Sequence, residues 1–402
     1  MFEKIKQLMT GNLSKGGRQV YIDDLRVIAT VFVIGVHTVS LAATMTEYGS
    51  IPFRVLTIFN FIFLSCNLLF VMLSGALLLP VKNESIGNFF RKRFTKVAIP
   101  LVVYYILYIV AKEGLVWLRP DHWILMLRRI LTGAPMEAPH FWLVYVIIWL
   151  YVLTPFMRYI VHNIPDTVLS GVIGVVFAIC ALDTYLPLYG INSVFGIVVD
   201  SYAGTFLLGY FLSEKCSRKV ENFFMFTGFL SFIETCMWIW NGNDYVNYIY
   251  QNSPTMMCFT AAIFLLVKRL ASQKTKSSFF VQWISRYSYS ILLIHWGVLH
   301  FVVKQKLHVN VLGGGIVGGC IVMMVLTLFI SAIGAMILDN TLLKWLQKPF
   351  TKKHLRRLPG STGAFFAFRK YRLFYTFSAQ SSYFASRKIF TQGGIPSERK
   401  PS

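Results

Sequence analysis

Long apolar stretches dominate the chain, and they predict helices that cross a membrane. A helix needs about 20 largely apolar residues to span the hydrocarbon core, and ten stretches approach that length. They cover residues 22–44, 55–79, 97–112, 141–161, 168–183, 193–213, 223–241, 255–271, 287–303 and 312–338. The first is as long as a true span and lacks a small-residue cleavage site, so we expect it to be retained. The pattern predicts an all-α, polytopic membrane helix bundle of about ten transmembrane helices.

Composition supports this class and argues against two others. Of 402 residues, 55% are hydrophobic and only 14% are charged, whereas a soluble domain carries about 25% charged residues. The 39 basic and 17 acidic residues give a net charge of +22. The basic residues lie between apolar stretches, which indicates membrane orientation rather than nucleic-acid binding. The six cysteines show no paired spacing, so we expect free buried thiols, with neither a disulfide framework nor a bound metal.

The distribution of Lys and Arg predicts the orientation. With the amino terminus inside, the inside segments hold more than twice as many basic residues as the outside loops, which places both termini in the cytoplasm. Residues 1–345 are predicted to form the transmembrane domain. Residues 346–402 are predicted to form a basic cytoplasmic tail, whose composition favours disorder over binding to anionic lipid. In the external loop 113–140, the segment WILMLRRILTG is typical of a helix lying in the membrane interface.

The first apolar stretch holds two candidate functional residues, Arg26 and His37. They are 11 residues apart, so both point to one side of a helix, about 16 Å apart along its axis. A guanidinium can grip phosphate, and an imidazole can transfer protons near neutrality. Two structural alternatives stay open, namely that Arg26 only snorkels to the boundary and that His37 only bonds a neighbouring helix.

Five segments in order resemble the acyltransferase family 3 of integral membrane proteins. The first is LR-x10-H, which contains Arg26 and His37. The others are LFVMLSGALLL (69–79), RKRFTKVAIP (91–100), HFWLVYVIIWLYVLTP (140–155) and SRYSYSILLIHWGVL (285–299). The resemblance covers about residues 18–345. One departure is that Lys96 stands where the family often has the second arginine of an R-x-x-R pair beginning at Arg93.

The resemblance implies an enzyme of the bacterial inner membrane that moves an acyl group, commonly acetyl from acetyl-CoA, onto a sugar hydroxyl. The acceptor would be a cell-envelope glycan or a lipid-linked precursor, and acyl-CoA would be a donor substrate rather than a bound cofactor. His37 would be the essential base or acyl relay, with Arg26 as its partner. The loop residues Arg91, Arg93 and Lys96 would contact the donor, although ordinary positive-inside topology explains them equally well.

Four further residues could line the cavity or contact the acceptor. His295 could orient a hydroxyl or form a core hydrogen bond. His140 and Trp142 lie at the outer mouth of a span, where a sugar could stack on the indole or an aromatic belt could form. Glu234 is a lone carboxylate within a span, either packed neutral or paired with a cavity histidine or arginine.

Two other classes of function remain open. A non-enzymatic exporter or flippase of a polysaccharide or lipid-linked sugar would also need many spans and an aromatic cavity. A proton-coupled transporter could use His37 and Glu234 as relays. Neither needs an anion site and an imidazole along one helix face, so the acyltransferase is the favoured hypothesis.

Overall fold

The computed structural model describes residues 20–81, 84–132, 138–191, 196, 200–242 and 252–350. Within these ranges the regular structure is helical and contains no strand. The α-helices are α2 (Val20–Ala43), α3 (Ile51–Leu78), α4 (Ile86–Arg93), α5 (Ile99–Glu113), α6 (Trp123–Thr132), α7 (Trp142–Asn163), α8 (Asp166–Tyr185), α10 (Ala203–Tyr210), α11 (Arg218–Trp240), α12 (Pro254–Ala271), α13 (Phe279–Gly297), α14 (Ile316–Leu338) and α15 (Lys344–Gln347). All of the described residues belong to one compact unit, Met1–His354. Apart from residues 346–350, the predicted tail lies outside the described residues.

Within the described ranges, eight helical segments are long and apolar enough to cross a membrane. The predicted fold class, an all-α polytopic helix bundle, is therefore confirmed. The predicted span 193–213 lies partly outside the described residues. The predicted span 287–303 falls on α13 and the π-helical segment Val298–Lys304, which are not among the eight. The first half of α13 carries several serines and Arg286, which lower its hydropathy. The count of ten and the cytoplasmic termini remain predictions.

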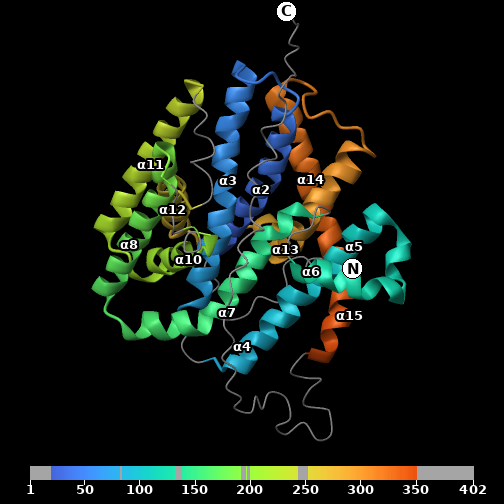
Figure 1. Cartoon of the computed structure of the whole chain (residues 1–402), viewed down its shortest axis with the longest axis horizontal. Coiled ribbons are helices and arrows are strands. Elements are labelled where there is room, and N and C mark those ends of the chain that lie inside the picture. The colour runs from blue at the N-terminus through green and yellow to red at the C-terminus, as the bar shows by residue number, and fades with distance from the viewer. Residues whose placement is uncertain are drawn as a thin grey trace, which may run out of the picture. The chain divides into compact units, whose positions relative to one another are not determined.

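The helices bury two large hydrophobic cores that meet along α2, α3 and α7. One core draws side chains from α3, α7, α8, α10 and α12, and the other from α2, α5, α7, α13 and α14. Figure 1 shows the same division, with α8, α10, α11 and α12 on one side of α3 and α5, α6, α13 and α14 on the other. Leucine, β-branched and aromatic side chains fill both cores, so a polar group buried there needs a hydrogen-bond partner.

Two glycines allow α3 and α10 to touch backbone to backbone. A Cβ atom at Gly75 would lie 1.8 Å from the carbonyl oxygen of Phe206, and one at Gly209 would lie 2.0 Å from that of Met72. Neither approach is possible for a larger residue. Small residues at such crossings are how membrane helices gain close packing, and the sequence LSG around Gly75 serves that purpose.

The ends of the bundle differ in charge. The amino termini of α2, α5 and α11 and the carboxyl termini of α3, α7 and α12 lie together with most of the ion pairs of the described residues, and we call this the basic end. There the buried Arg158 of α7 donates to the carbonyl oxygen of Leu78 at 2.7 Å and to Glu84 at 3.1 Å. Arg158 thereby closes the open carboxyl end of α3.

At the opposite end, α6 forms the amphipathic helix predicted from WILMLRRILTG. Its apolar side chains Trp123, Ile124, Leu127 and Leu131 are exposed, as expected for contact with lipid headgroups and acyl chains. Arg129 is held by Glu113 at 2.7 Å and lies over the ring of Trp117. This helix therefore covers the end of α5 on the far side from the basic end.

Candidate functional site

Three histidines from distant parts of the sequence meet near the end of the bundle opposite the basic end. The ring centroids of His37 and His295 are 5.2 Å apart, those of His140 and His295 are 5.0 Å apart, and those of His37 and His140 are 6.2 Å apart. His295 is fully buried, His140 is 5% exposed, and His37 is half-buried. All three were candidates from the sequence, and the structure brings them into one cluster, which we call the histidine cluster.

Each histidine is positioned by a different kind of backbone. His37 projects from the second half of α2, whereas His140 lies in the tight turn Pro139–Phe141 that begins the α7 span. His295 lies in the last turn of α13, just before the helix widens into the π-helical segment Val298–Lys304. π-Helical turns are rare and frequently occur at functional sites.

Backbone carbonyl oxygens near the end of α13 hold two of the imidazole rings. His140 Nε2 lies 3.1 Å from the carbonyl oxygen of Leu293. His295 Nδ1 lies 2.8 Å from that of Leu292 and 3.2 Å from that of Ile291. A carbonyl oxygen only accepts hydrogen bonds, so both of these ring nitrogens carry the proton.

The other nitrogen of each held ring is then an unprotonated acceptor. His140 Nδ1 and His295 Nε2 are both buried, and neither has a hydrogen-bond partner among the described residues. A buried acceptor without a donor costs about 1–3 kcal/mol. The histidine cluster therefore holds two acceptor atoms for which the described residues supply no donor.

Aromatic side chains enclose the histidine cluster. The Tyr108 hydroxyl donates to the carbonyl oxygen of Leu293 at 3.0 Å and accepts from the Gly297 backbone N–H at 2.8 Å. Tyr108 thus fixes the same turn that holds His140. The Trp296 ring stacks parallel to that of His140 with centroids 6.0 Å apart. Trp296 is half-buried.

A second group of polar residues lies nearer the basic end, around Tyr151 of α7. The Arg93 guanidinium lies over the rings of Phe89 and Tyr151, each at 5.2 Å. Arg26 of α2 also acts electrostatically on the Tyr151 hydroxyl. The Nε atom of Arg93 is buried without a hydrogen-bond partner among the described residues. Arg93 therefore contacts Tyr151 directly, and the charge of Arg26 reaches the same hydroxyl only through its electrostatic field.

The histidine cluster and the polar group around Tyr151 both draw residues from α2 and from the span that contains α7. Along α2, Arg26 precedes His37 by 11 residues, and the same interval separates His140, in the turn before α7, from Tyr151. An interval of 11 residues returns to nearly the same helix face about 16 Å further along. Arg26 acts on Tyr151 while His37 meets His140. Both α2 side chains therefore face the α7 span, on one side of α2.

The remaining loop candidates are spread over the surface of the basic end. Arg91 is half-buried and donates to Asn88 at 2.8 Å, whereas Lys96 is exposed. Asp23, beside Arg26 in sequence, is 1% exposed and accepts from Ser285 at 2.6 Å. Asp24 forms an ion pair with Lys274 at 3.0 Å. These contacts tie α2 to α13 and to the segment that follows α12.

Two predicted residues lie away from the histidine cluster. Trp142 turns toward the other core, where its ring lies 5.9 Å from that of Tyr202. Glu234 is exposed on α11, a helix that packs on α12 and α3. The expectations that Trp142 lines the acceptor site and that Glu234 pairs with a cavity histidine or arginine are therefore not supported. Trp296, which lies next to His295, occupies the place expected for the stacking indole.

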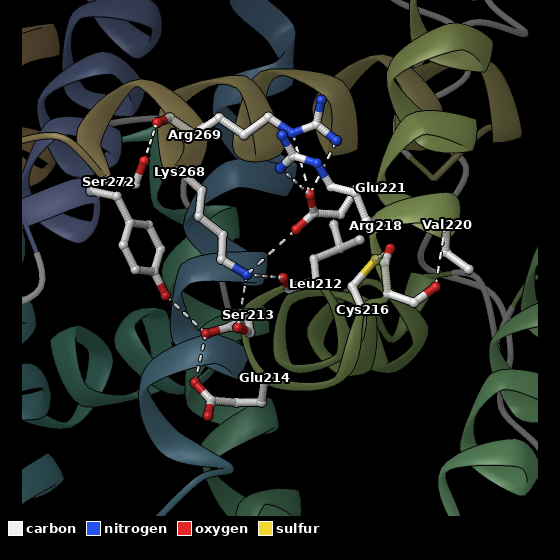
Figure 2. Close-up of polar contacts among 12 residues, drawn as sticks. Leu212, Ser213, Glu214, Cys216, Arg218, Val220, Glu221, Lys268, Arg269 and Ser272 are labelled. Carbon is white, nitrogen blue, oxygen red and sulfur yellow. Dashed lines mark hydrogen bonds and ion pairs between the residues drawn. The ribbon is translucent and has the colours of Figure 1, made fainter.

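A further charged group at the basic end is internally satisfied. Glu221 pairs with Arg218 and Arg269, each at 3.1 Å, and Lys268 donates to the carbonyl oxygens of Leu212 and Ser213 (Figure 2). These contacts fasten α11 to α12 and to the π-helical turn after α10. Because each of these cations already has acceptors within the chain, this group has a structural role in joining helices.

Two observations bear on which residues could take part in a reaction. Among the described residues, no group of three His, Cys, Asp or Glu side chains could hold a metal ion. A groove between α2 and α14 offers only apolar side chains. Its lining consists of Val31, Ile34, Ile321, Met324, Val325 and Leu328. The polar groups suited to a reaction are therefore those of the histidine cluster and of the pair of arginines at Tyr151.

Comparison with known proteins agrees with the architecture. Residues 19–338 match the model of an acyltransferase domain, and this match covers well over half of the chain. No curated protein and no solved structure matches. The matched range contains the whole histidine cluster, both arginines and all eight candidate spans except the last residues of the eighth. The chain is therefore a multi-pass membrane protein that belongs to acyltransferase family 3.

Proposed function

We propose that this acyltransferase moves an acyl group, commonly acetyl, from acyl-CoA to a hydroxyl of a cell-surface or lipid-linked glycan in the inner membrane. The observation that carries the proposal is the arrangement of two polar groups along α2 and α7. Arg93 lies over the Tyr151 ring, the charge of Arg26 acts on the same hydroxyl, and His37 lies about 16 Å beyond Arg26 along α2, within the histidine cluster. An elongated donor with a phosphorylated end and a reactive thioester end matches this separation.

The donor's anionic end is assigned to the basic end of the bundle. Arg26 and Arg93 offer guanidinium groups, which bind phosphate through two parallel hydrogen bonds. Arg91 of α4 and Lys96 of the π-helical turn Phe94–Ala98 add positive charge nearby, and Lys96 would act as a point charge rather than a fork. The acyl arm then extends between α2 and α7 toward His37.

The transfer needs one base and no external energy source, because a thioester is already activated. The acceptor oxygen bonds to the thioester carbonyl carbon as its proton passes to His37. The carbon–sulfur bond then breaks, and the departing sulfur takes the proton from His37, so that an ester and a free thiol result. In the competing route, a His37 ring nitrogen bonds to the carbonyl carbon, the carbon–sulfur bond breaks and the sulfur leaves as the thiol with the imidazole proton. The acceptor oxygen then takes the acyl group from the ring as its own proton returns to the imidazole.

The proposal is tested with isolated membranes and acetyl-CoA labelled in its acetyl group. Membranes that contain the protein should incorporate label into envelope glycan, whereas membranes from a deletion strain and from a His37→Ala strain should not. Arg218→Ala is the matched control, because Arg218 is exposed and lies in the structural group around Glu221. Equal incorporation with and without the protein would contradict the proposal and favour a flippase.

A further inference from the structure

We propose that His140 Nδ1 and His295 Nε2 form a hydroxyl-binding site that holds two neighbouring O–H groups of the acceptor beside His37. This inference rests on the proposed acyl transfer for its biological meaning. Its physical basis is independent of that reaction. It stands on two buried acceptor atoms that lack donors among the described residues and on the backbone contacts that fix their protonation.

The backbone prevents either ring from satisfying its own acceptor. Turning the His295 ring over would place a C–H group against the carbonyl oxygen of Leu292, where Nδ1–H now donates at 2.8 Å. Turning His140 over would lose its bond to Leu293. Each change would leave a buried carbonyl without its donor, so both rings stay fixed with their lone pairs directed elsewhere.

Within the chain, His37 can donate a hydrogen bond to only one of the two unsatisfied acceptor nitrogens. A neutral imidazole carries a single N–H, and the His37 ring lies 5.2 Å from His295 and 6.2 Å from His140 between centroids. His37 can therefore satisfy at most one of the two acceptors. At least one acceptor awaits a donor from a ligand, and both do when His37 acts as a base.

The chemistry of the site selects hydroxyl groups. Two neutral acceptors 5.0 Å apart between ring centroids can bind a pair of O–H donors on adjacent carbon atoms. A carboxylate or phosphate has no donor to offer, so such groups are disfavoured. The parallel ring of Trp296 beside His140 adds an apolar surface against which a sugar ring can lie. The ligand class is therefore a polyol such as a sugar.

The direct test is nitrogen NMR of the full-length protein in lipid nanodiscs, with histidine labelled with 15N. The assignments come from the variants His140→Gln and His295→Asn. Proton-coupled spectra should show that His295 carries its proton on Nδ1 and His140 on Nε2. Ethylene glycol, with two adjacent hydroxyls, should shift the signals of His140 Nδ1 and His295 Nε2. The matched probe 1,2-dimethoxyethane, with the same skeleton and no O–H, should not.

Opposite tautomers would overturn the inference, as would equal shifts with both probes or no shift with the glycol. These outcomes do not depend on catalysis. If the glycol shifts both signals while membranes incorporate no label, the hydroxyl site stands and the proposed acyl transfer fails.

A pair of variants tests the same site during turnover. His295→Asn keeps an N–H donor at the Nδ1 position and removes the second acceptor, whereas His295→Gln places an amide oxygen near the Nε2 position. At saturating acetyl-CoA, the rate of transfer to the membrane acceptor should fall about 10-fold in His295→Asn and less in His295→Gln. The KM for acetyl-CoA should change less than twofold in both. Equal losses in the two variants would indicate a merely structural histidine.

Discussion

At the scale of single residues, the charged side chains differ in their burial and in the groups that they contact. Arg158 is buried against the Phe89 ring and satisfies both a helix end and Glu84. Arg218 is 71% exposed and shares Glu221 with two other cations. A buried pair that loses one partner leaves an uncompensated charge, whereas an exposed pair loses little. The two arginines therefore form a matched comparison.

Arg158→Ala is expected to destabilise the protein by about 3 kcal/mol. The change leaves Glu84 partly buried with only Lys92 at 2.6 Å and leaves the carbonyl of Leu78 without its donor. Arg218→Ala should change stability by less than about 0.5 kcal/mol. Thermal unfolding in detergent measures both, and similar midpoints for the two variants would contradict the assigned role of Arg158.

The contribution of the Glu84 carboxylate to the stability of the fold should depend on pH. Burial raises the pKa of this carboxyl, but the hydrogen bonds and charges of Lys92 and Arg158 lower it further, so the net pKa lies below the usual 4.5. A depressed pKa means that the ionised form stabilises the fold at higher pH and that this stabilisation disappears as pH falls through the folded pKa. The melting difference between wild type and Glu84→Gln should thus be constant near neutrality and shrink below about pH 4.5. A melting difference that grows as the pH falls would contradict a lowered pKa for Glu84.

Arg26→Ala is expected to act on donor binding. Removing the guanidinium takes away one of the two charges at Tyr151, so the KM for acetyl-CoA should rise about 10-fold or more. Transfer at saturating donor should fall much less, because His37 lies about 16 Å away. Steady-state kinetics over a range of acetyl-CoA concentrations make this measurement. An unchanged KM with a reduced maximal rate would place Arg26 at the reaction step.

At the scale of helices, the apolar pattern predicts most elements but not their neighbours. Eight of the predicted stretches fall on helices able to span a membrane, because a long apolar run has no other stable conformation in lipid. The 11-residue interval in α2 was sufficient to place Arg26 and His37 on one side. Nothing local predicts that residues 37, 140 and 295 meet, or that Glu84 pairs with Arg158, because such contacts depend on long-range packing.

The two misplaced candidates show the same limit. Trp142 follows His140 by two residues, so the turn into α7 directs the two side chains to different cores. Glu234 lies on α11, where Gly228, Ser231 and Thr235 form the buried face and leave the carboxylate exposed. The spacing of these small residues could have indicated that Glu234 is exposed, since small residues mark the packed face of a membrane helix.

Helix packing gives a further prediction at Gly75. Gly75→Ala places a methyl group 1.8 Å from the carbonyl oxygen of Phe206, so α3 and α10 must separate. Gly171→Ala in α8 is the control, because a Cβ there meets no atom within 4 Å. We expect Gly75→Ala to lower the melting temperature by several degrees, or to prevent accumulation of folded protein, and Gly171→Ala to be neutral. Equal behaviour of the two variants would mean that α3 and α10 do not touch as described.

At the scale of the whole molecule, donor and acceptor can reach the reacting group from opposite ends. The arginines belong to the basic end, which the positive-inside rule predicts to be cytoplasmic, whereas the histidine cluster lies nearer the other end. Such an arrangement would let a cytoplasmic donor acylate an acceptor on the outer side without moving the whole donor across the membrane. Which end of the bundle faces the cytoplasm therefore decides whether the donor and the acceptor approach from opposite sides of the membrane.

Single cysteines introduced into a cysteine-free protein test that orientation. Asp121→Cys and Gln273→Cys place exposed thiols at opposite ends of the bundle. A membrane-impermeant thiol reagent should label Asp121→Cys in intact cells, whereas Gln273→Cys should react only after the membrane is opened. The reverse pattern would place the arginines outside and make a cytoplasmic acyl donor untenable.

The central claim is that His37 carries out the transfer while the arginines hold the donor, and it is tested most directly by comparing turnover and donor binding in one variant. His37→Ala, purified in nanodiscs and supplied with labelled acetyl-CoA and membrane-extracted acceptor, should transfer acetyl at least about 100-fold more slowly than wild type. Its Kd for acetyl-CoA should stay within about twofold, because the arginines remain. Normal turnover in purified His37→Ala would contradict the account.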